Sequence, residues 1–221
     1  MKCIFNGLHY EITEHNATLL GFAKASRFVQ DNIPNLIIPD YVENVPVTVV
    51  EKFAFKDVEE IEKIIFPKHL KKIKTGAFYG CLHLKKVTMP NIKNHSVILE
   101  DFAFAQCLDL EDVELMCSLS IQKYAFQACN KLKTVCAAIT QLDNFVFEGC
   151  KNLQLITIQE NASIMCLALT QCKIENIRCM GTVRFEMETI CDILEQEANI
   201  LCEENSEMVD LAYCGVPVSF I

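Results

Sequence analysis

The sequence has few of the residues that interrupt regular structure. Only 7 glycines and 6 prolines occur among 221 residues, which excludes a collagen-like chain and argues against a long flexible linker. No run of about 18 apolar residues is present, so we expect no membrane-spanning helix. Hydrophobic residues make up 51% of the chain, which indicates a folded protein with a single core.

Positive charge is also scarce. The chain has 20 Lys and Arg against 29 Asp and Glu, a net charge of −9. Because nucleic-acid binding needs clustered Lys and Arg, we expect no nucleic-acid partner. The N-terminus, MKCIFNGLHYEITEH, lacks the apolar run of a secretory signal, which predicts a cytoplasmic protein without membrane insertion.

Cysteine, in contrast, is abundant. The odd number of 13 cysteines, together with the missing signal, predicts free thiols in a reducing compartment. Five of them end similar fragments, AFYGC, AFAQC, AFQAC, VFEGC and ALTQC. Three interpretations fit this recurrence: metal ligands, half of a disulfide set, or parts of a core. The five are Cys81, Cys107, Cys129, Cys150 and Cys172.

The fragments belong to a longer repeat. We number each copy from the first residue of its fragment, called slot zero. Aliphatic residues recur four positions before slot zero and seven and ten positions after it, and slot one is Phe in five of six copies. A period of 20 to 29 residues with this pattern is typical of leucine-rich repeat solenoids. The zero slots are Ala54, Ala77, Ala103, Ala125, Val146 and Ala168, spaced 21 to 26 residues apart.

The slots have distinct structural roles. Slots ten and twelve alternate with polar residues and predict a strand with one buried face. Slots zero, one and four have the spacing of a short helical turn, which would point Ala, Phe and Cys inward. Stacked copies would align these side chains into a core ladder. Its members are Cys81, Cys107, Cys129, Cys150, Cys172, Phe55, Phe78, Phe104, Phe126 and Phe147.

The first copy helps to choose among the interpretations of the cysteines. Val58 occupies the cysteine slot there, and valine can replace a packing cysteine but neither a ligand nor a disulfide half. Structural zinc sites also need close cysteine pairs, and the chain has no C-x-x-C. Buried cysteine packs as a small hydrophobe. We therefore interpret the five cysteines as core residues and expect no metal and no cofactor.

With this repeat pattern the sequence resembles the BspA-type leucine-rich repeat proteins, also called the Treponema pallidum-type repeat. Their unit, C-x-x-L-x-x-I-x-L-P followed by a link and V-x-x-I-x-x-x-A-F-x-x-C, is matched by AFYGCLHLKKVTMP and AFQACNKLKTV. The resemblance covers residues 34–180 in about six copies. It implies a right-handed repeat solenoid with a concave parallel β-sheet. It also implies adhesion or host-surface recognition as one use, and hence a cell-surface location as the alternative to the cytoplasm.

The two ends are predicted to cap this solenoid within one domain. Residues 1–33 predict a β-hairpin on Asn6–Gly7 and a further strand at Ala17–Phe22. Residues 181–221, with nine acids and one Arg, predict an amphipathic acidic helix and a last strand. A degenerate seventh repeat remains an alternative for this end, as does an acidic docking helix. The apolar face of the helix would comprise Met187, Ile190, Cys191, Leu194, Ala198 and Leu201.

Motifs of catalysis are absent. The chain has no G-x-S-x-G, G-x-x-x-x-G-K-[ST], H-E-x-x-H or G-x-G-x-x-G, and we predict a protein that is not an enzyme. We expect it to bind a partner protein through the outward residues of the strands, in slots nine and eleven, because solenoids usually bind there. These residues run from basic through acidic to neutral: Lys63, Ile65, Lys86, Thr88, Asp112, Glu114, Thr134, Cys136, Leu155 and Thr157.

Uneven charge supports an alternative function. Residues 51–100 hold ten Lys and six acids, a local net charge of +4, whereas residues 181–221 have a net charge of −8. Such polarity would promote weak, salt-dependent head-to-tail association. The alternatives to partner binding in adhesion are therefore a self-associating structural protein and an intracellular adaptor.

Overall fold

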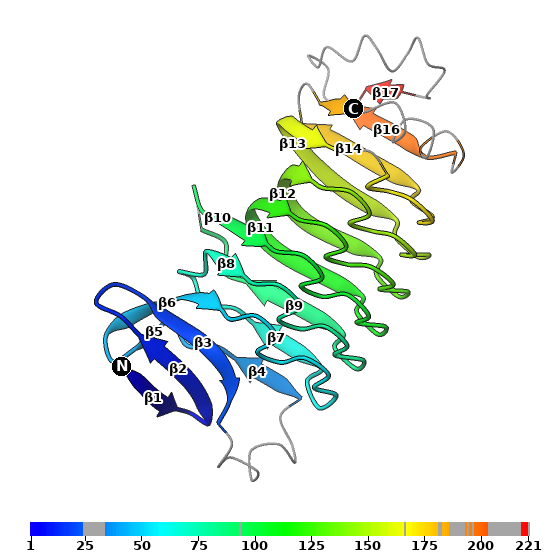
Figure 1. The fold of residues 1–221 in the computed structure, drawn as a ribbon. Helices are drawn as coiled ribbons and strands as arrows, with labels where there is room; N and C mark the ends of the chain where they lie inside the picture. The colour runs from blue at the N-terminus through cyan, green and yellow to red at the C-terminus, as the bar shows by residue number, and fades with distance from the viewer. Residues whose placement is uncertain are drawn as a thin grey trace.

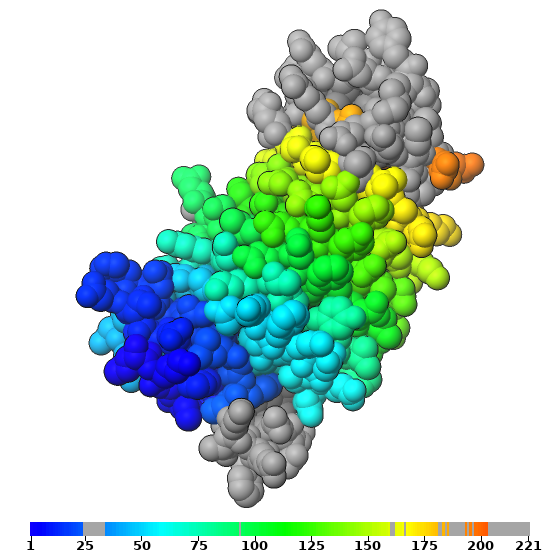
Figure 2. Space-filling view, viewed as in Figure 1, coloured from blue at the N-terminus to red at the C-terminus, as the bar shows by residue number. Residues whose placement is uncertain are grey.

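The predicted solenoid is confirmed: the chain forms a β-solenoid of about six turns, which we call coils. The computed structural model describes residues 1–23, 34–92, 94–165, 167–180, 183–185, 193, 195, 197–202 and 218–220. The coils follow one another along an elongated stack that begins at an antiparallel N-terminal cap (Figure 1). Successive coils form successive bands on the surface, so each coil packs on its sequence neighbours (Figure 2).

The first strand row contains the strands that the repeat predicts. Slot ten of each coil pairs in parallel with slot ten of the next, from Ile64 through Val87 and Val113 to Val135 and Ile156. Burial alternates along these strands, because one face packs against the core. The row comprises β4 (Asn35–Ile37), β7 (Lys63–Ile65), β9 (Lys86–Met89), β11 (Asp112–Ile121), β12 (Thr134–Leu142), β13 (Leu155–Ile164), β14 (Asn176–Met180), β16 (Asn199–Cys202) and β17 (Val218–Phe220).

A second strand row was missed from the sequence. It passes through the aliphatic slot four residues before slot zero, where Val50 pairs with Ile73, Ile73 with Leu99 and Leu99 with Ile121. These strands are short, and their side chains at this slot are fully buried. The row comprises β6 (Val45–Val50), β8 (Lys72–Ile73), β10 (Ser96–Leu99), the second halves of β11, β12 and β13, and β15 (Arg184–Phe185).

The two rows meet at corners in β11, β12 and β13. The register between β11 and β12 shifts between Glu114 and Ser118, so that β11 carries extra residues at the corner. A similar shift follows Val135 in β12, where it pairs with β13. Such bulges bend a strand and let a single chain segment serve both rows. The corners thus bring residues of the two rows next to each other.

The structure corrects the prediction of short helical turns. The A-F-x-x-C segments are runs of hydrogen-bonded turns in which alternate N–H groups bond in different directions. The N–H of Ala77 donates to Lys74 of its own coil at 3.1 Å, whereas that of Phe78 donates to Ala103 of the next coil at 2.9 Å. Positive φ angles recur one residue before slot zero and three after it, which no α-helix allows. These turns therefore bond the coils to each other.

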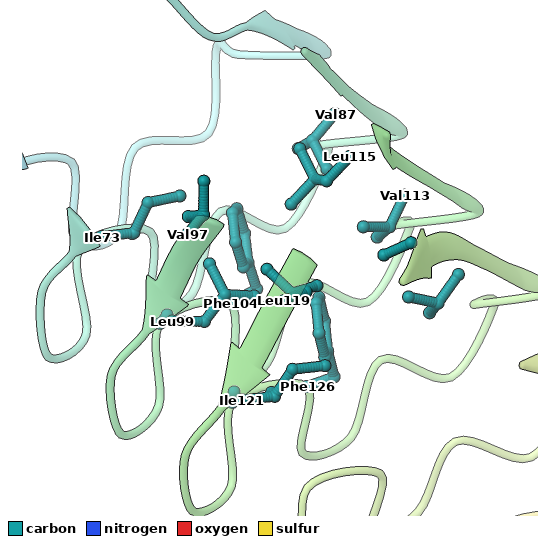
Figure 3. Close-up of a cluster of buried hydrophobic side chains, with 14 of the residues drawn as sticks. Ile73, Val87, Val97, Leu99, Phe104, Val113, Leu115, Leu119, Ile121 and Phe126 are labelled. Atoms are coloured by element: carbon teal, nitrogen blue, oxygen red, sulfur yellow. The ribbon is translucent and has the colours of Figure 1, made fainter. Parts of the chain in front are cut away.

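The core lies between the two strand rows and these turns. Side chains from β8, β9, β10 and β11 point inward around Phe104 and Phe126 (Figure 3). The slot-one phenylalanines form a continuous stack, with ring centroids 5.2 to 5.6 Å apart and planes within 8° of parallel. Stacking of identical rings in register makes the same side chain favourable in every coil. The stack comprises Phe55, Phe78, Phe104, Phe126 and Phe147.

The N-terminal cap follows the prediction from the sequence. Strands β1 (Lys2–Phe5) and β2 (Leu8–Ile12) form an antiparallel hairpin whose turn residues Asn6 and Gly7 both have positive φ. Strand β3 (Ala17–Phe22) pairs with β2 and, in parallel, with β6. A second hairpin, between β5 (Tyr41–Val42) and β6, turns at Glu43–Asn44 and was not predicted. The cap thus closes the second strand row at its N-terminal end.

The helical C-terminal cap is not confirmed, because residues 186–192, 194 and 196 lie outside the described part of the chain. Ile193 and Glu195 are helical, but the predicted helix does not reach Leu201, which lies in β16. β16 pairs in parallel with β14, and β17 pairs with β16. Ile177, Ile200 and Val218 continue the slot-ten register. The first strand row therefore extends beyond residue 180.

Candidate functional site

The ten outward residues predicted from slots nine and eleven lie side by side on the first strand row; we call them the strand strip. Lys63 pairs with Lys86, and Lys86 with Asp112, while Thr88 pairs with Glu114. All ten are partly or fully exposed, because their strand neighbours in slots ten and twelve take the buried face. The strip is thus a regular surface of mixed charge.

The central charges of the strand strip interact with each other. Lys86 forms an ion pair with Glu114 of the next coil, and this hydrogen bond raises the pKa of the Lys86 ammonium. Thr134 donates from Oγ1 to Asp112 at 3.0 Å. Lys63 has no ion pair within the described residues. The central strip is therefore electrostatically satisfied, and its basic end is open to a partner.

A cavity of about 500 Å³ opens where the strand strip meets the corners of β11 and β12; we call it the corner pocket. Three strip residues line it, Cys136, Leu155 and Thr157, and the other seven lie outside it. Sequence reasoning missed the remaining lining residues. They are Asn91, Ile92, Asn94, His95, Met116, Cys117, Ser118, Ala137, Ala138, Gln159 and Arg178.

One irregularity of the repeat builds a wall of the corner pocket. The interval between Ala77 and Ala103 is 26 residues, longer than the other intervals, and it contains a loop with Asn91, Ile92, Asn94 and His95. His95 hydrogen-bonds from Nε2 to the carbonyl of Leu70, and its own carbonyl accepts the N–H of Ser118 at 2.9 Å. The unequal length of the repeats was thus the one signal in the sequence from which this loop could have been located.

The corner pocket has an apolar side and a side with a positive charge. Met116 projects from the β11 corner and is 49% exposed, an unusual degree for a large apolar residue. Thr157 and Arg178 are opposite each other on β13 and β14. Within the described residues, neither their side chains nor that of Gln159 has a hydrogen-bond or ion-pair partner. The described part of the lining includes no Asp or Glu that would neutralise Arg178.

The slot-four cysteines lie in the core, with exposures of 0 to 8%. The thiol of Cys129 donates to the carbonyl of Phe104 in the preceding coil at 3.1 Å, and three others bond in the same way to the preceding slot-one residue. Burial raises the pKa of the Cys129 thiol to about 12. Thiols held this way are poor nucleophiles. The donors with this pattern are Cys81, Cys107, Cys129 and Cys150.

The described residues lack two other kinds of feature. No group of three or more His, Cys, Asp or Glu in that part of the chain is placed to hold a metal ion. Likewise, no helix in the described ranges has the length and apolarity to cross a bilayer. The strand strip and the corner pocket are the surfaces on which a functional interpretation can be built.

The sequence pattern of the BspA type leucine-rich repeat region matches six copies in this chain, over residues 24–137 and 91–190. The chain belongs to the BspA-type leucine-rich repeat family. Leucine-rich repeat proteins are typically scaffolds for protein interactions, and no enzymatic family is indicated. No curated protein matches the chain by sequence.

Solved structures of BspA-like proteins share the fold. A leucine-rich cell surface protein from Faecalibacterium prausnitzii superposes with a TM-score of 0.68 at 22% identity, over 94% of this chain and 55% of its own. The Treponema pallidum leucine-rich repeat protein has a TM-score of 0.57 at 16% identity, over 82% of this chain and 86% of its own. This chain thus spans about half of the first protein.

Proposed function

We propose that this protein is a non-catalytic scaffold that binds a partner protein through the strand strip. The strip supports this proposal, because it presents a continuous, ordered row of polar, charged and apolar side chains held in register by the sheet. A rigid surface of this kind loses little entropy on binding. Solenoids commonly bind along the face that their stacked units create.

We further propose that this binding serves adhesion or recognition at a cell surface. The family supports the scaffold function, and the similar Faecalibacterium prausnitzii protein is described as a cell surface protein. The alternative is an intracellular adaptor. The two functions differ in where the partner is found.

A pull-down compares wild type with a strip variant in which Lys63, Lys86, Asp112 and Glu114 are changed to Ala. Two cations and two anions are removed, so the net charge of the bait is unchanged. Captured proteins are identified by mass spectrometry from two sources, lysate of the source cells and an extract of host cells or matrix. Binding of each captured protein is then measured with purified components.

A matched control variant changes four exposed residues outside the strip, Glu59, Glu60, Lys123 and Lys151, to Ala. We expect a partner that binds wild type and the control with equal affinity. Its affinity for the strip variant should be at least tenfold lower, because several charged contacts are lost. A partner in the host or matrix extract supports adhesion, and one in the lysate supports the adaptor. Equal binding to all three proteins contradicts the proposal.

A further inference from the structure

The corner pocket separates an unpaired cation from an apolar wall. Arg178 and its cross-strand neighbour Thr157 stand on one side, with Gln159 further along β13. Met116 and Ile92 contribute apolar surface from the β11 corner and the inserted loop. A ligand that satisfies both sides must carry a negative group and a large apolar group next to each other.

The cation favours a carboxylate over a phosphate. Among the described lining residues Arg178 is the one Lys or Arg, and phosphate recognition usually draws on several cations or a cluster of N–H donors. A planar guanidinium pairs well with a single carboxylate through two parallel hydrogen bonds. No acidic residue in the described lining competes for these donors. The charge complement of this side is therefore an Asp or Glu side chain.

The apolar wall favours a side chain of substantial size. Met is flexible and polarisable and adapts to the shape of the group packed on it, which suits an exposed position in a binding surface. The cavity volume of about 500 Å³ lies in the range of sites that bind small ligands or a few residues of a peptide. Amides of Asn91, Asn94 and Gln159 around it can bond to a peptide backbone.

We propose that the corner pocket binds a short peptide segment in which an Asp or Glu lies beside a large apolar residue, the carboxylate pairing with Arg178 and the apolar side chain packing on Met116. This inference deepens the proposed function, because the pocket is continuous with the strand strip through Cys136, Leu155 and Thr157. It names the chemistry of the contact that the partner makes at this end of the strip.

An array of acetylated, amidated hexapeptides tests the proposal. The two central positions take every pair of residue types in a Gly-Ser background, and blocked ends remove terminal charges. We expect the strongest binding from pairs that combine Asp or Glu with a large apolar residue. The best peptide is then labelled and titrated with the full chain by fluorescence anisotropy, beside the same peptide with Asn or Gln in place of its acid.

Variants of the chain assign the contacts. Arg178→Gln is expected to weaken binding about tenfold, as for loss of a charge-assisted hydrogen bond, and to remove the preference for the acid. Met116→Ser should reduce the preference for the apolar residue and keep that for the acid. Lys123→Gln removes the same charge at an exposed site outside the pocket and should bind as wild type does. Urea midpoints equal to wild type exclude misfolding as the cause.

Two results would overturn the inference: no hexapeptide binds, or binding is indifferent to the acid and to Arg178→Gln. Failure here is separate from failure of the proposed function. The strip variant keeps every lining residue of the pocket and should still bind the peptide. If a partner depends on the strip but no peptide binds, the scaffold function stands and the pocket proposal is wrong. If a peptide binds but no partner depends on the strip, the pocket proposal stands and the proposed function of the strip is wrong.

Discussion

Gly21 is the residue at which the N-terminal cap comes closest to the first coil. Its φ of +120° lies in a region that side chains rarely adopt, and an added Cβ would lie 2.2 Å from the carbonyl oxygen of Ala54. This oxygen belongs to backbone that is held by the stacked turns, so it cannot move away cheaply. Glycine is therefore required here by both conformation and space.

We predict that Gly21→Ala lowers the free energy of unfolding by about 3 kcal/mol or more, as for a severe steric clash. Urea denaturation followed by circular dichroism measures the loss. Gly149→Ala is the matched control, because its φ is also positive, at +76°, but the nearest atom to the new Cβ is 3.7 Å away. The control should lose only about 1–2 kcal/mol. Equal losses would contradict the steric explanation.

Tyr124 shows how a bulky residue is kept at positive φ. Its φ is +60°, and its ring stacks between those of Phe102 and Phe145 at 5.0 and 5.1 Å. Each such contact contributes about 0.5–1.5 kcal/mol, which offsets the strain of about 1–2 kcal/mol. Stacking between Phe102 and Phe145 thus stabilises a backbone conformation of Tyr124 that is otherwise unfavourable.

We predict that Tyr124→Gly is more stable than Tyr124→Ala by about 1 kcal/mol, although both are less stable than wild type. Both variants lose the stacking, but only Gly also relieves the backbone strain. Thermal unfolding of the three proteins gives the order. At the neighbouring Lys123, whose φ is not positive, Ala should be more stable than Gly. The same order at both sites would show that the strain at Tyr124 is negligible.

At the scale of the element, the cysteine ladder joins adjacent coils through thiol donors. The first copy has Val58 in this slot, and it has no preceding repeat whose slot-one carbonyl it could satisfy. Burial raises the pKa of Cys107 and Cys150 as well as that of Cys129. Cysteine in these slots combines small volume with a donor, and this explains the recurrence better than volume alone.

The ladder predicts alkaline instability. A raised pKa keeps the folded thiol protonated while the unfolded thiol ionises, so its contribution is complete below about pH 9 and is lost as the pH rises toward about 12. In that window Cys129→Ala should reduce the fall in unfolding free energy by about 1.4 kcal/mol per pH unit. Urea denaturation at a series of pH values measures this slope.

The control is Val135→Ala, which removes buried volume without removing an ionisable group. It should lower stability by a similar amount at every pH and leave the slope unchanged. A Cys129→Ala protein whose stability falls with pH as steeply as wild type would show that this thiol does not titrate on unfolding.

At the scale of the whole molecule, five of the nine described lysines in residues 51–100 pair with carboxylates of neighbouring coils. Lys68 lies 3.2 Å from Asp40, and Lys86 pairs with Glu114. Both carboxylates lie outside residues 51–100, so the local net charge of +4 does not count them. Each exposed pair contributes little to stability, but it reduces the positive charge available to another molecule. The local net charge of +4 thus overstates the attraction that this end would exert on an acidic end.

We therefore predict that the protein sediments as a monomer at both low and high salt. Analytical ultracentrifugation at several protein concentrations measures the mass. A larger species at low salt that dissociates at high salt would favour the alternative of head-to-tail self-association, because only long-range charge attraction is screened in this way.

The sequence predicted most of what repeats. The register of the first strand row, the phenylalanine stack and the burial of the cysteines all follow from slots that recur in six copies. The second strand row was missed, although its slot is aliphatic in every copy. Its strands are short, and one of only two residues, such as β8, gives no alternating pattern in the sequence. The turns were taken for helix, because inward spacing does not reveal the sign of φ.

What the sequence by itself determined is thus the family, the stacking direction of the coils and the identity of the core, since each coil buries the same slots against its neighbours. Only the tertiary structure decided where a ligand could be held. The corner pocket combines a loop inserted in one coil, a bulged residue of the next and an arginine from a later strand. Arg178 continues slot eleven opposite Thr157, whereas the inserted loop and the bulge fit no repeat slot. These parts meet because two strand rows bend toward each other at the corners.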